Sequence, residues 1–416
     1  MPFRHLVIVG ASAAGITAAE AIRSVDPGAN LTVVAAEREE PYARIFVPKR
    51  LSEELPVSRL AMRPPGLWAR LAARAILGRS AVGLDNDQHE LWLDDGTRLP
   101  YDGLLVATGA SPAQLSCPGQ GLDRVSGLRT WADAERIAGW LRSARQVLVI
   151  GAGLVSVKAL EALVRRPLAL TVVASSAQVL GQLLDPAPAA AVKARMEARG
   201  VRVLTGADVV RLEGDGRVER AVLSTGEILP CDLALVGKGV IPNAAWLAGS
   251  GLDSPQGIPI DDRCRTSLPD VYAAGDVAAA HDLARGSARI NAMWPNAVAQ
   301  GRVAGLNMAG SPATYDGSLS MNIGAFFDLP AAAVGQSRPR SSEYREHVLS
   351  ADGERYRKIV EHEGRIVGAM LTGDLRPAGA LQSLIRRRAP LAEWEPLLAR
   401  RQFTLPARIG AIARRI

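Results

Sequence analysis

The sequence predicts an α/β protein with two parallel-sheet units and a smaller α+β domain at its C-terminal end. A strand, glycine turn and helix occur in that order twice. The chain has 416 residues, too many for one ordinary core. Its composition, 48% hydrophobic and 22% charged, is typical of globular proteins. Its apolar runs are shorter than a membrane span and its N-terminus lacks a signal-peptide pattern, so we expect a cytoplasmic protein.

The first strand, turn and helix lie at the N-terminus. An apolar strand over residues 5–9 leads into the turn GASAAG over 10–15, and a helix is predicted over 16–25. Small residues let the backbone approach a pyrophosphate, and the helix N-terminus favours its charge. A second strand over 30–36 ends near Glu37, placed to accept hydrogen bonds from a ribose. The predicted contacts of this Rossmann-type unit are Gly10, Ser12 (in place of the middle glycine), Ala13, Ala14, Gly15 and Glu37.

The same pattern returns in the middle of the chain. A strand over 146–150 runs into the turn GAGLVS over 151–156, followed by a helix over 157–164 and a strand over 168–174. A repeated Rossmann-type unit implies two nucleotides, or one nucleotide and a vestigial site. The contacts predicted for this second unit are Gly151, Gly153, Ser156 and Ser175.

Cysteine and histidine patterns indicate no metal site. Cys117, Cys231 and Cys264 are isolated from one another, which favours small buried side chains over a redox disulfide. The five histidines show no paired spacing.

The net charge of +7 comes mostly from arginine, concentrated toward the C-terminus. These arginines are either a docking face for an acidic partner or solvated helix faces. No nucleic-acid-binding signature occurs. The residues are Arg386, Arg387, Arg388, Arg400, Arg401, Arg408, Arg414 and Arg415.

Two further segments resemble the FAD motifs of the pyridine nucleotide-disulfide oxidoreductase superfamily. Residues 101–110 (YDGLLVATGA) resemble the strand and turn that pass close to FAD there, which implies contacts from Thr108 and Gly109. Residues 266–276 (TSLPDVYAAGD) resemble the second FAD motif, in which the aspartate, here Asp276, holds the ribityl chain.

Residues 41–49 (PYARIFVPK) are similar to the flavin-contacting stretch of rubredoxin, ferredoxin and nitrite reductase-like members. This resemblance implies that Arg44 and Ala81 contact FAD and that Lys49 lies near the flavin N5. It also implies a helix at 297–301 that points at the flavin, where its dipole stabilises negative charge. Trp294 is expected either to wall the flavin or to be a plain core residue.

The resemblance covers nearly the whole chain and implies a domain order. We expect a discontinuous FAD domain over 1–113 and 240–314, an NAD(P)H-binding domain over 114–239 and a C-terminal interface domain over 315–416. Prolines and glycines mark the crossings between them. The last domain commonly forms the dimer interface in relatives, which implies a homodimer.

The chain departs from the superfamily at its thiols and at its second nucleotide turn. No cysteine lies near residues 44–48, so thiolate chemistry at the flavin is not expected. Relatives carry glycine where Ser156 stands and, when they prefer NADH, an acid where Ala174 stands. Because that acid is missing, the sequence slightly favours NADPH over NADH.

Lys158 stands where relatives carry a glutamate that pairs with the lysine matching Lys49. Two lysines could therefore face one another, unless Glu161 intervenes. Such a pair would repel and would favour an anionic reduced flavin, which makes Lys49 and Lys158 the candidate catalytic residues. The alternative is that Lys158 points to solvent.

Three functions follow from these patterns. In the first, an enzyme passes electrons from NAD(P)H through FAD to a protein carrier, such as an acidic ferredoxin or rubredoxin, or to a partner reductase. In the second, a flavin-bound relay subunit of a larger complex no longer uses NAD(P)H. In the third, an NAD(P)H oxidase hands electrons to oxygen.

Overall fold

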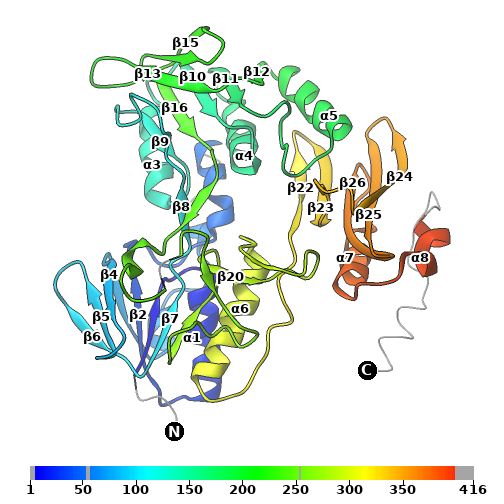
Figure 1. Cartoon of the computed structure of the whole chain (residues 1–416). Helices are drawn as coiled ribbons and strands as arrows, with labels where there is room; N and C mark the ends of the chain where they lie inside the picture. The colour runs from blue at the N-terminus through cyan, green and yellow to red at the C-terminus, as the bar shows by residue number, and fades with distance from the viewer. Residues whose placement is uncertain (1–4, 53–56, 253, 399–416) are drawn as a thin grey trace.

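The computed structural model describes residues 5–52, 57–252 and 254–398 and contains three five-stranded sheets (Figure 1). The sheets draw on residues 5–106 with 271–273, on 125–236, and on 321–372. The predicted boundaries at 113, 239 and 314 fall between these stretches and remain a proposal. Within the described ranges, no helix combines the length and apolar character needed to cross a membrane.

The first sheet is parallel, in the order β19-β7-β1-β2-β3. Its central strand β1 is buried on both faces, as its unbroken apolar run predicts. The strands are β1 (His5–Val9), β2 (Asn30–Ala35), β3 (Ala73–Leu77), β7 (Gly103–Val106) and β19 (Val271–Ala273). The surrounding elements are α1 (Ala13–Val25), η1 (Arg44–Ser52), η2 (Val57–Leu60), α2 (Leu67–Arg70), β4 (Ala81–Asp85), β5 (Glu90–Leu93), β6 (Arg98–Pro100), η3 (Ala245–Leu247), β18 (Ile258–Pro259), β20 (Ala278–His281), β21 (Ala288–Arg289) and α6 (Trp294–Met308).

Helices α1 and α6 pack in close contact beside this sheet because two glycines of α6 lack a side chain. A Cβ on Gly301 would lie 2.2 Å from the carbonyl oxygen of Ala14, and one on Gly305 would lie 2.4 Å from that of Ala18. The N-terminus of α6 is thereby held beside the glycine turn that precedes α1.

The second sheet is also parallel, in the order β12-β11-β10-β16-β9, and belongs to the stretch inserted between the two parts of the first. Two short strands connect the first unit to the inserted stretch and the inserted stretch back to the first unit. They are β8 (Ala110–Pro112) and β17 (Val240–Pro242), and they pair with each other. The inserted elements are β9 (Val125–Gly127), α3 (Trp131–Trp140), β10 (Gln146–Ile150), α4 (Leu154–Leu163), β11 (Ala169–Ala174), α5 (Pro186–Glu197), β12 (Val201–Thr205), β13 (Val209–Glu213), β14 (Arg220–Leu223), β15 (Ile228–Pro230) and β16 (Leu233–Val236).

The third sheet is antiparallel, in the order β22-β23-β26-β25-β24. Its β22–β23 hairpin lies next to α5 (Figure 1). Phe326 and Phe327 at the turn of this hairpin are buried in the core that α4 and α5 share. The C-terminal unit is thus anchored on the inserted one. Its elements are β22 (Met321–Phe326), β23 (Leu329–Gly335), β24 (Arg345–Asp352), β25 (Arg355–His362), β26 (Arg365–Thr372), α7 (Ala378–Arg386) and α8 (Leu391–Leu398).

Candidate functional site

The turn between β1 and α1 can be built only with glycine at two positions. Gly10 has a φ of +119°, and a Cβ there would lie 2.1 Å from the carbonyl oxygen of Ala107. A Cβ on Gly15 would lie 1.8 Å from the carbonyl oxygen of Gly10. Ser12 precedes α1 without capping it through its side chain. The first N–H groups of the helix and the Ser12 hydroxyl are therefore left for an anion.

A cavity of about 360 Å³ opens against this turn. Its walls come from the ends of β1, β2 and β7 and from the start of β4, so segments far apart in sequence meet there. The cavity brings together seven of the predicted cofactor contacts: Gly10, Ser12, Glu37, Arg44, Ala81, Thr108 and Gly109. Ala13, Ala14 and Gly15 lie buried within α1 beneath it.

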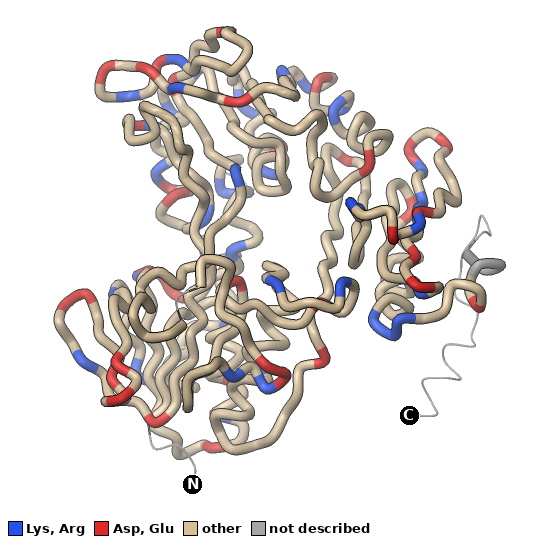
Figure 2. The backbone as a smooth tube through the Cα atoms, viewed as in Figure 1, with Lys and Arg blue, Asp and Glu red and all other residues tan. Residues whose placement is uncertain are grey.

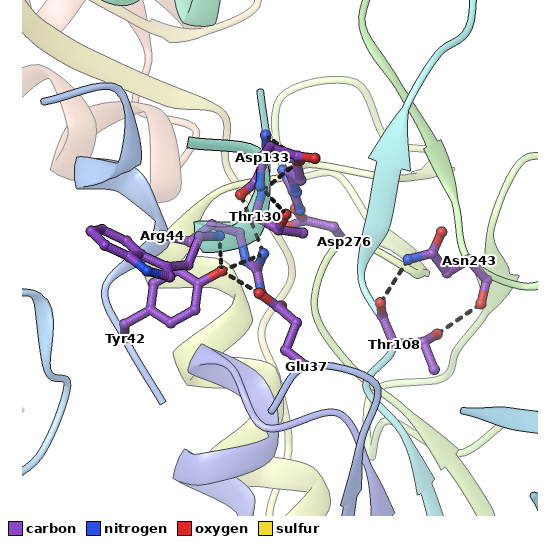
Figure 3. Close-up of polar contacts among 10 residues, drawn as sticks. Glu37, Tyr42, Arg44, Thr108, Thr130, Asp133, Asn243 and Asp276 are labelled. Carbon is purple, nitrogen blue, oxygen red and sulfur yellow. Dashed lines mark hydrogen bonds and ion pairs between the residues drawn. The ribbon is translucent and has the colours of Figure 1, made fainter. Parts of the chain in front are cut away.

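Glu37 and Arg44 form an ion pair of 2.5 Å on the cavity wall (Figure 3). Tyr42 donates its hydroxyl to the same carboxylate and accepts a hydrogen bond from the backbone N–H of Trp131 at 2.8 Å. Burial raises the pKa of Tyr42 well above its ordinary value, so the hydroxyl remains a donor at neutral pH. The Glu37 carboxylate is held in place and still has lone pairs that could accept from a ribose.

Asp276, labelled in Figure 3, forms an ion pair of 2.7 Å with Arg129. Arg129 also lines the cavity. Arg129 comes from the inserted unit, whereas Asp276 comes from the loop after β19. A capping box at the start of α3 fixes the backbone beside Arg129: Thr130 accepts from the N–H of Asp133, and Asp133 accepts from the N–H groups of Arg129 and Thr130. Arg129 thus joins Arg44 and Arg79 among the residues that line the cavity.

Sequence reasoning missed Arg129 as a site residue. The Thr130-x-x-Asp133 pattern ahead of an apolar helix was a readable capping signal. It would have located the start of α3, but nothing in the sequence places that helix start beside Asp276.

Thr108 and Asn243 join the two crossings between the first and second units (Figure 3). The Asn243 amide donates to the Thr108 carbonyl at 3.0 Å, and the Thr108 hydroxyl donates to the Asn243 carbonyl at 2.8 Å. Because Thr108 and Asn243 both line the cavity, the connection between the two units forms part of the cavity wall.

The second glycine turn, between β10 and α4, has the same construction. Gly151 has a φ of +97°, and a Cβ there would lie 2.4 Å from the carbonyl oxygen of Gly237. Ser156, which replaces the expected third glycine, is buried, and its hydroxyl has no hydrogen-bond partner among the described residues. A Cβ on Gly237 would lie 2.0 Å from that hydroxyl, so Gly237 makes the room that Ser156 needs. Gly153 and Ser175 are exposed at the ends of this turn and of β11.

Lys158 is paired with Glu161 in the structure, which is the alternative that the sequence left open to two unpaired lysines. Its ammonium lies 2.6 Å from the Glu161 carboxylate and donates to the carbonyl of Ala325 in β22. Lys49 is exposed, with its ammonium 5.1 Å from the ring centroid of Phe46. The proposed effect of a lysine pair on the flavin therefore loses its electrostatic basis.

Trp294 and the three cysteines do not line the dinucleotide cavity. Trp294 is the first residue of α6 and packs, partly buried, against the core shared with α1. Cys231 and Cys264 are buried, and burial raises the pKa of each thiol to about 12. Cys117 is partly exposed. Among the described residues, no group of three or more His, Cys, Asp or Glu side chains could hold a metal ion.

The arginines at the end of α7 are described, and the turn that follows this helix is blue in Figure 2. They are Arg386, Arg387 and Arg388, and the structure leaves them exposed. Arg400, Arg401, Arg408, Arg414 and Arg415 lie outside the described residues.

These residues fit FAD in the first unit. The turn exposes backbone and a helix N-terminus to a pyrophosphate, and Glu37 offers a carboxylate at the end of β2. Arg44 and Arg129 line the cavity as guanidinium donors, each paired with one carboxylate. Ile45 and Phe46 are 60% and 38% exposed and present apolar surface on residues 41–49, the stretch similar to the flavin-contacting one. The flat ring system of a flavin binds against apolar surface of this kind.

Fold and site together define an oxidoreductase with two dinucleotide-binding units. The model of the pyridine nucleotide-disulphide oxidoreductase family matches residues 4–301, and that of the rubredoxin NAD+ reductase C-terminal domain matches residues 321–389. The chain belongs to the pyridine nucleotide-disulphide oxidoreductase family, whose members use FAD and NAD(H).

Relatives of known name agree with this assignment. The chain is 35% identical to the NADH-dependent phenylglyoxylate dehydrogenase subunit epsilon of Aromatoleum evansii, over 92% of each chain. It is 31% identical to the rubredoxin-NAD(+) reductase of Pseudomonas putida, over 74% of this chain and 80% of the relative.

Solved structures of similar proteins extend the likeness over the whole fold. The ferredoxin reductase for the CYP199A2 system of Rhodopseudomonas palustris matches with a TM-score of 0.86 and 25% identity, covering 97% of this chain and 98% of that one. The covalent putidaredoxin reductase-putidaredoxin complex matches with a TM-score of 0.87 and 25% identity, covering 98% of each chain.

Proposed function

We propose that this protein oxidises NADH and passes the electrons, through FAD in its first unit, to a separate redox protein. The observation that carries the proposal is the pair of glycine turns, in which Gly10 and Gly151 each face a carbonyl oxygen that leaves no room for a side chain, in a chain whose three cysteines are all free. Electrons that enter from a nicotinamide therefore need an acceptor on another molecule. FAD, when bound, supplies the conversion of a two-electron donor into one-electron steps.

The residues divide the binding work between the two units. The turn at Gly10 and the N-terminus of α1 hold the FAD pyrophosphate, with the guanidinium groups of Arg44 and Arg129 as further hydrogen-bond donors in the same cavity. Glu37 accepts from the ribose, and Asp276 holds the sugar-alcohol chain. The turn at Gly151 and the N-terminus of α4 hold the pyrophosphate of NADH.

We propose NADH, not NADPH, as the donor. The preference for NADPH read from Ala174 has no support, because the relatives whose names state a nucleotide use NADH or NAD(+). A 2′-phosphate also calls for a cation, and Ser175 and Ser176 at the end of β11 are followed by Ala177 and Gln178.

The acceptor is either a small carrier or a redox subunit of a larger enzyme. The named relatives include both kinds: a rubredoxin reductase, and a subunit of a dehydrogenase. The exposed arginines at the end of α7 offer an acidic protein one docking surface. Homodimer formation and a cytoplasmic location stay predictions.

Anaerobic stopped-flow spectroscopy tests the proposal. NADH should bleach the oxidised flavin band, NADPH should do so at least tenfold more slowly, and an oxidised ferredoxin or rubredoxin should then restore the band. A flavin that stays oxidised with both nucleotides would indicate a relay subunit. Reoxidation by oxygen that is faster than by either carrier would indicate an oxidase.

A further inference from the structure

A second cavity, of about 390 Å³, lies between α6, the segment that follows it and α7. One face of α6 forms a wall through Pro295, Ala299, Arg302, Val303 and Leu306, which lie on one face because three and four residues separate neighbours along a helix. None of its lining residues lines the dinucleotide cavity. The proposed transfer of electrons does not involve this second cavity.

The walls of this cavity are mainly apolar. Val303 and Leu319 are 8% and 3% exposed, and Leu306 continues the same surface along α6. Met293 and Met321 line the cavity at the start of α6 and of β22. Methionine side chains adapt to ligands of different shape, so the cavity suits an apolar body that need not be of one fixed form.

Two arginines add a positive charge to this apolar site. Arg302 forms no ion pair or hydrogen bond with any other residue that the structure describes, and it is exposed. Arg386 on α7 has one acidic neighbour, Asp316, at 3.7 Å, and that carboxylate is itself 81% exposed. At this separation and exposure the pair is weak, so both guanidinium groups can bind a ligand acid.

We propose that this cavity binds a small organic acid with an apolar body and one carboxylate. The carboxylate lies on Arg302 and Arg386, and the apolar body packs against Val303, Leu319 and the methionines. Because α6 belongs to the first unit and α7 to the C-terminal unit, the bound acid holds these two units together.

Other occupants match the cavity less well. Residues 399–416 of this chain contain five arginines and no Asp or Glu, so their charge repels Arg302 and Arg386. An acidic protein could place one carboxylate at the rim, but the apolar wall with buried Val303 and Leu319 fits a small molecule whose body enters the cavity. Both occupants are outcomes of the experiment below.

Isothermal titration of the FAD-loaded full-length protein tests the proposal with three acids: 3-phenylpropionate, hexanoate and indole-3-acetate. At least one should bind at one site per chain and raise the melting temperature. Its amide should bind at least tenfold more weakly, because an amide cannot replace the charge-assisted bonds. Arg302→Gln should weaken the acid at least tenfold, and Ala299→Leu, which fills the cavity, should do the same.

Arg142→Gln is the matched control, since Arg142 is an exposed arginine on the inserted unit that does not line the cavity. It should bind the acid as the unaltered protein does. The proposal is overturned if none of the three acids binds, or if Arg302→Gln and Ala299→Leu bind them normally. It is also overturned if a crystal structure places residues 399–416 in the cavity, or if Arg302→Gln weakens only an acidic redox protein.

Discussion

Lys158 and Glu161 form an ion pair of 2.6 Å along α4, and both hold the β22–β23 hairpin by its backbone. Lys158 donates to the Ala325 carbonyl, while Glu161 accepts from the N–H of Phe327 at 2.5 Å. The helix that begins at the second glycine turn is therefore fastened to the C-terminal unit. A residue that the sequence suggested for the flavin thus has a structural partner.

Removing either member of this pair should loosen the hairpin. We expect Lys158→Met and Glu161→Leu each to lower the free energy of unfolding by about 1 kcal/mol, since each leaves a backbone group without its partner. Chemical denaturation measures this. The matched control is Lys193→Met on α5, whose exposed pair with Glu197 at 3.6 Å should contribute little.

Removing Lys158 and Glu161 together should leave the midpoint potential of the flavin unchanged. Because Lys158 and Glu161 neutralise each other, the double variant Lys158→Met/Glu161→Gln should keep the potential of the unaltered protein. Spectroelectrochemical titration measures it. A clear fall in the double variant would restore a direct electrostatic role for Lys158.

Gly301→Ala should strongly destabilise the protein and weaken FAD binding, because the new Cβ would meet the Ala14 carbonyl at 2.2 Å and push α6 away from α1. We expect a loss of about 2 kcal/mol or more in thermal or chemical unfolding. Gly139→Ala in α3 has nothing within 4 Å of the added Cβ and should instead stabilise by about 0.5 kcal/mol or more. Equal effects at both sites would contradict the packing described for α1 and α6.

Arg129→Met and Asp276→Asn should each weaken FAD retention at least tenfold, because Arg129 lines the cavity and Asp276 forms an ion pair with it. Fluorescence titration of the flavin-free protein with FAD measures this. Arg142→Met, on an arginine outside the cavity, should retain FAD normally. Normal affinity in both site variants would remove Arg129 and Asp276 from the cofactor site.

The two buried thiols predict a loss of stability in alkaline solution. Burial raises the pKa of Cys231 and of Cys264 from 9.0 to about 12 in the folded protein, so above pH 9 the thiols ionise in the unfolded chain first. The contribution of the two thiols to the free energy of unfolding is complete below pH 9 and disappears as the pH rises toward 12. Cys264→Ala should make this decline shallower in denaturation curves measured between these limits. An unchanged decline would show that other groups cause it.

Local patterns predicted the elements of the fold closely. The strands at 5–9 and 146–150 agree with β1 and β10, because continuous apolar runs before a glycine turn leave few alternatives. The helices begin three residues earlier than predicted, at Ala13 and Leu154, since the second half of each turn already belongs to the helix.

Contacts between units could not be predicted in the same way. Arg129 reaches Asp276 across 147 positions of sequence, and Gly237 makes room for Ser156 from a different strand end. The hydrogen bond from Lys158 to the Ala325 carbonyl in β22 likewise depends on where the third sheet packs against α4. A single sequence contains periodicity and turn chemistry but not the relative placement of its domains.

The most direct measurement is the flavin content of the purified protein. Acid or heat denaturation followed by chromatography identifies and counts the released flavin. We predict close to one FAD per chain, or reconstitution to that value when FAD is added. A colourless protein that takes up no FAD would contradict the assignment of the Gly10 turn and, with it, the proposed route for electrons.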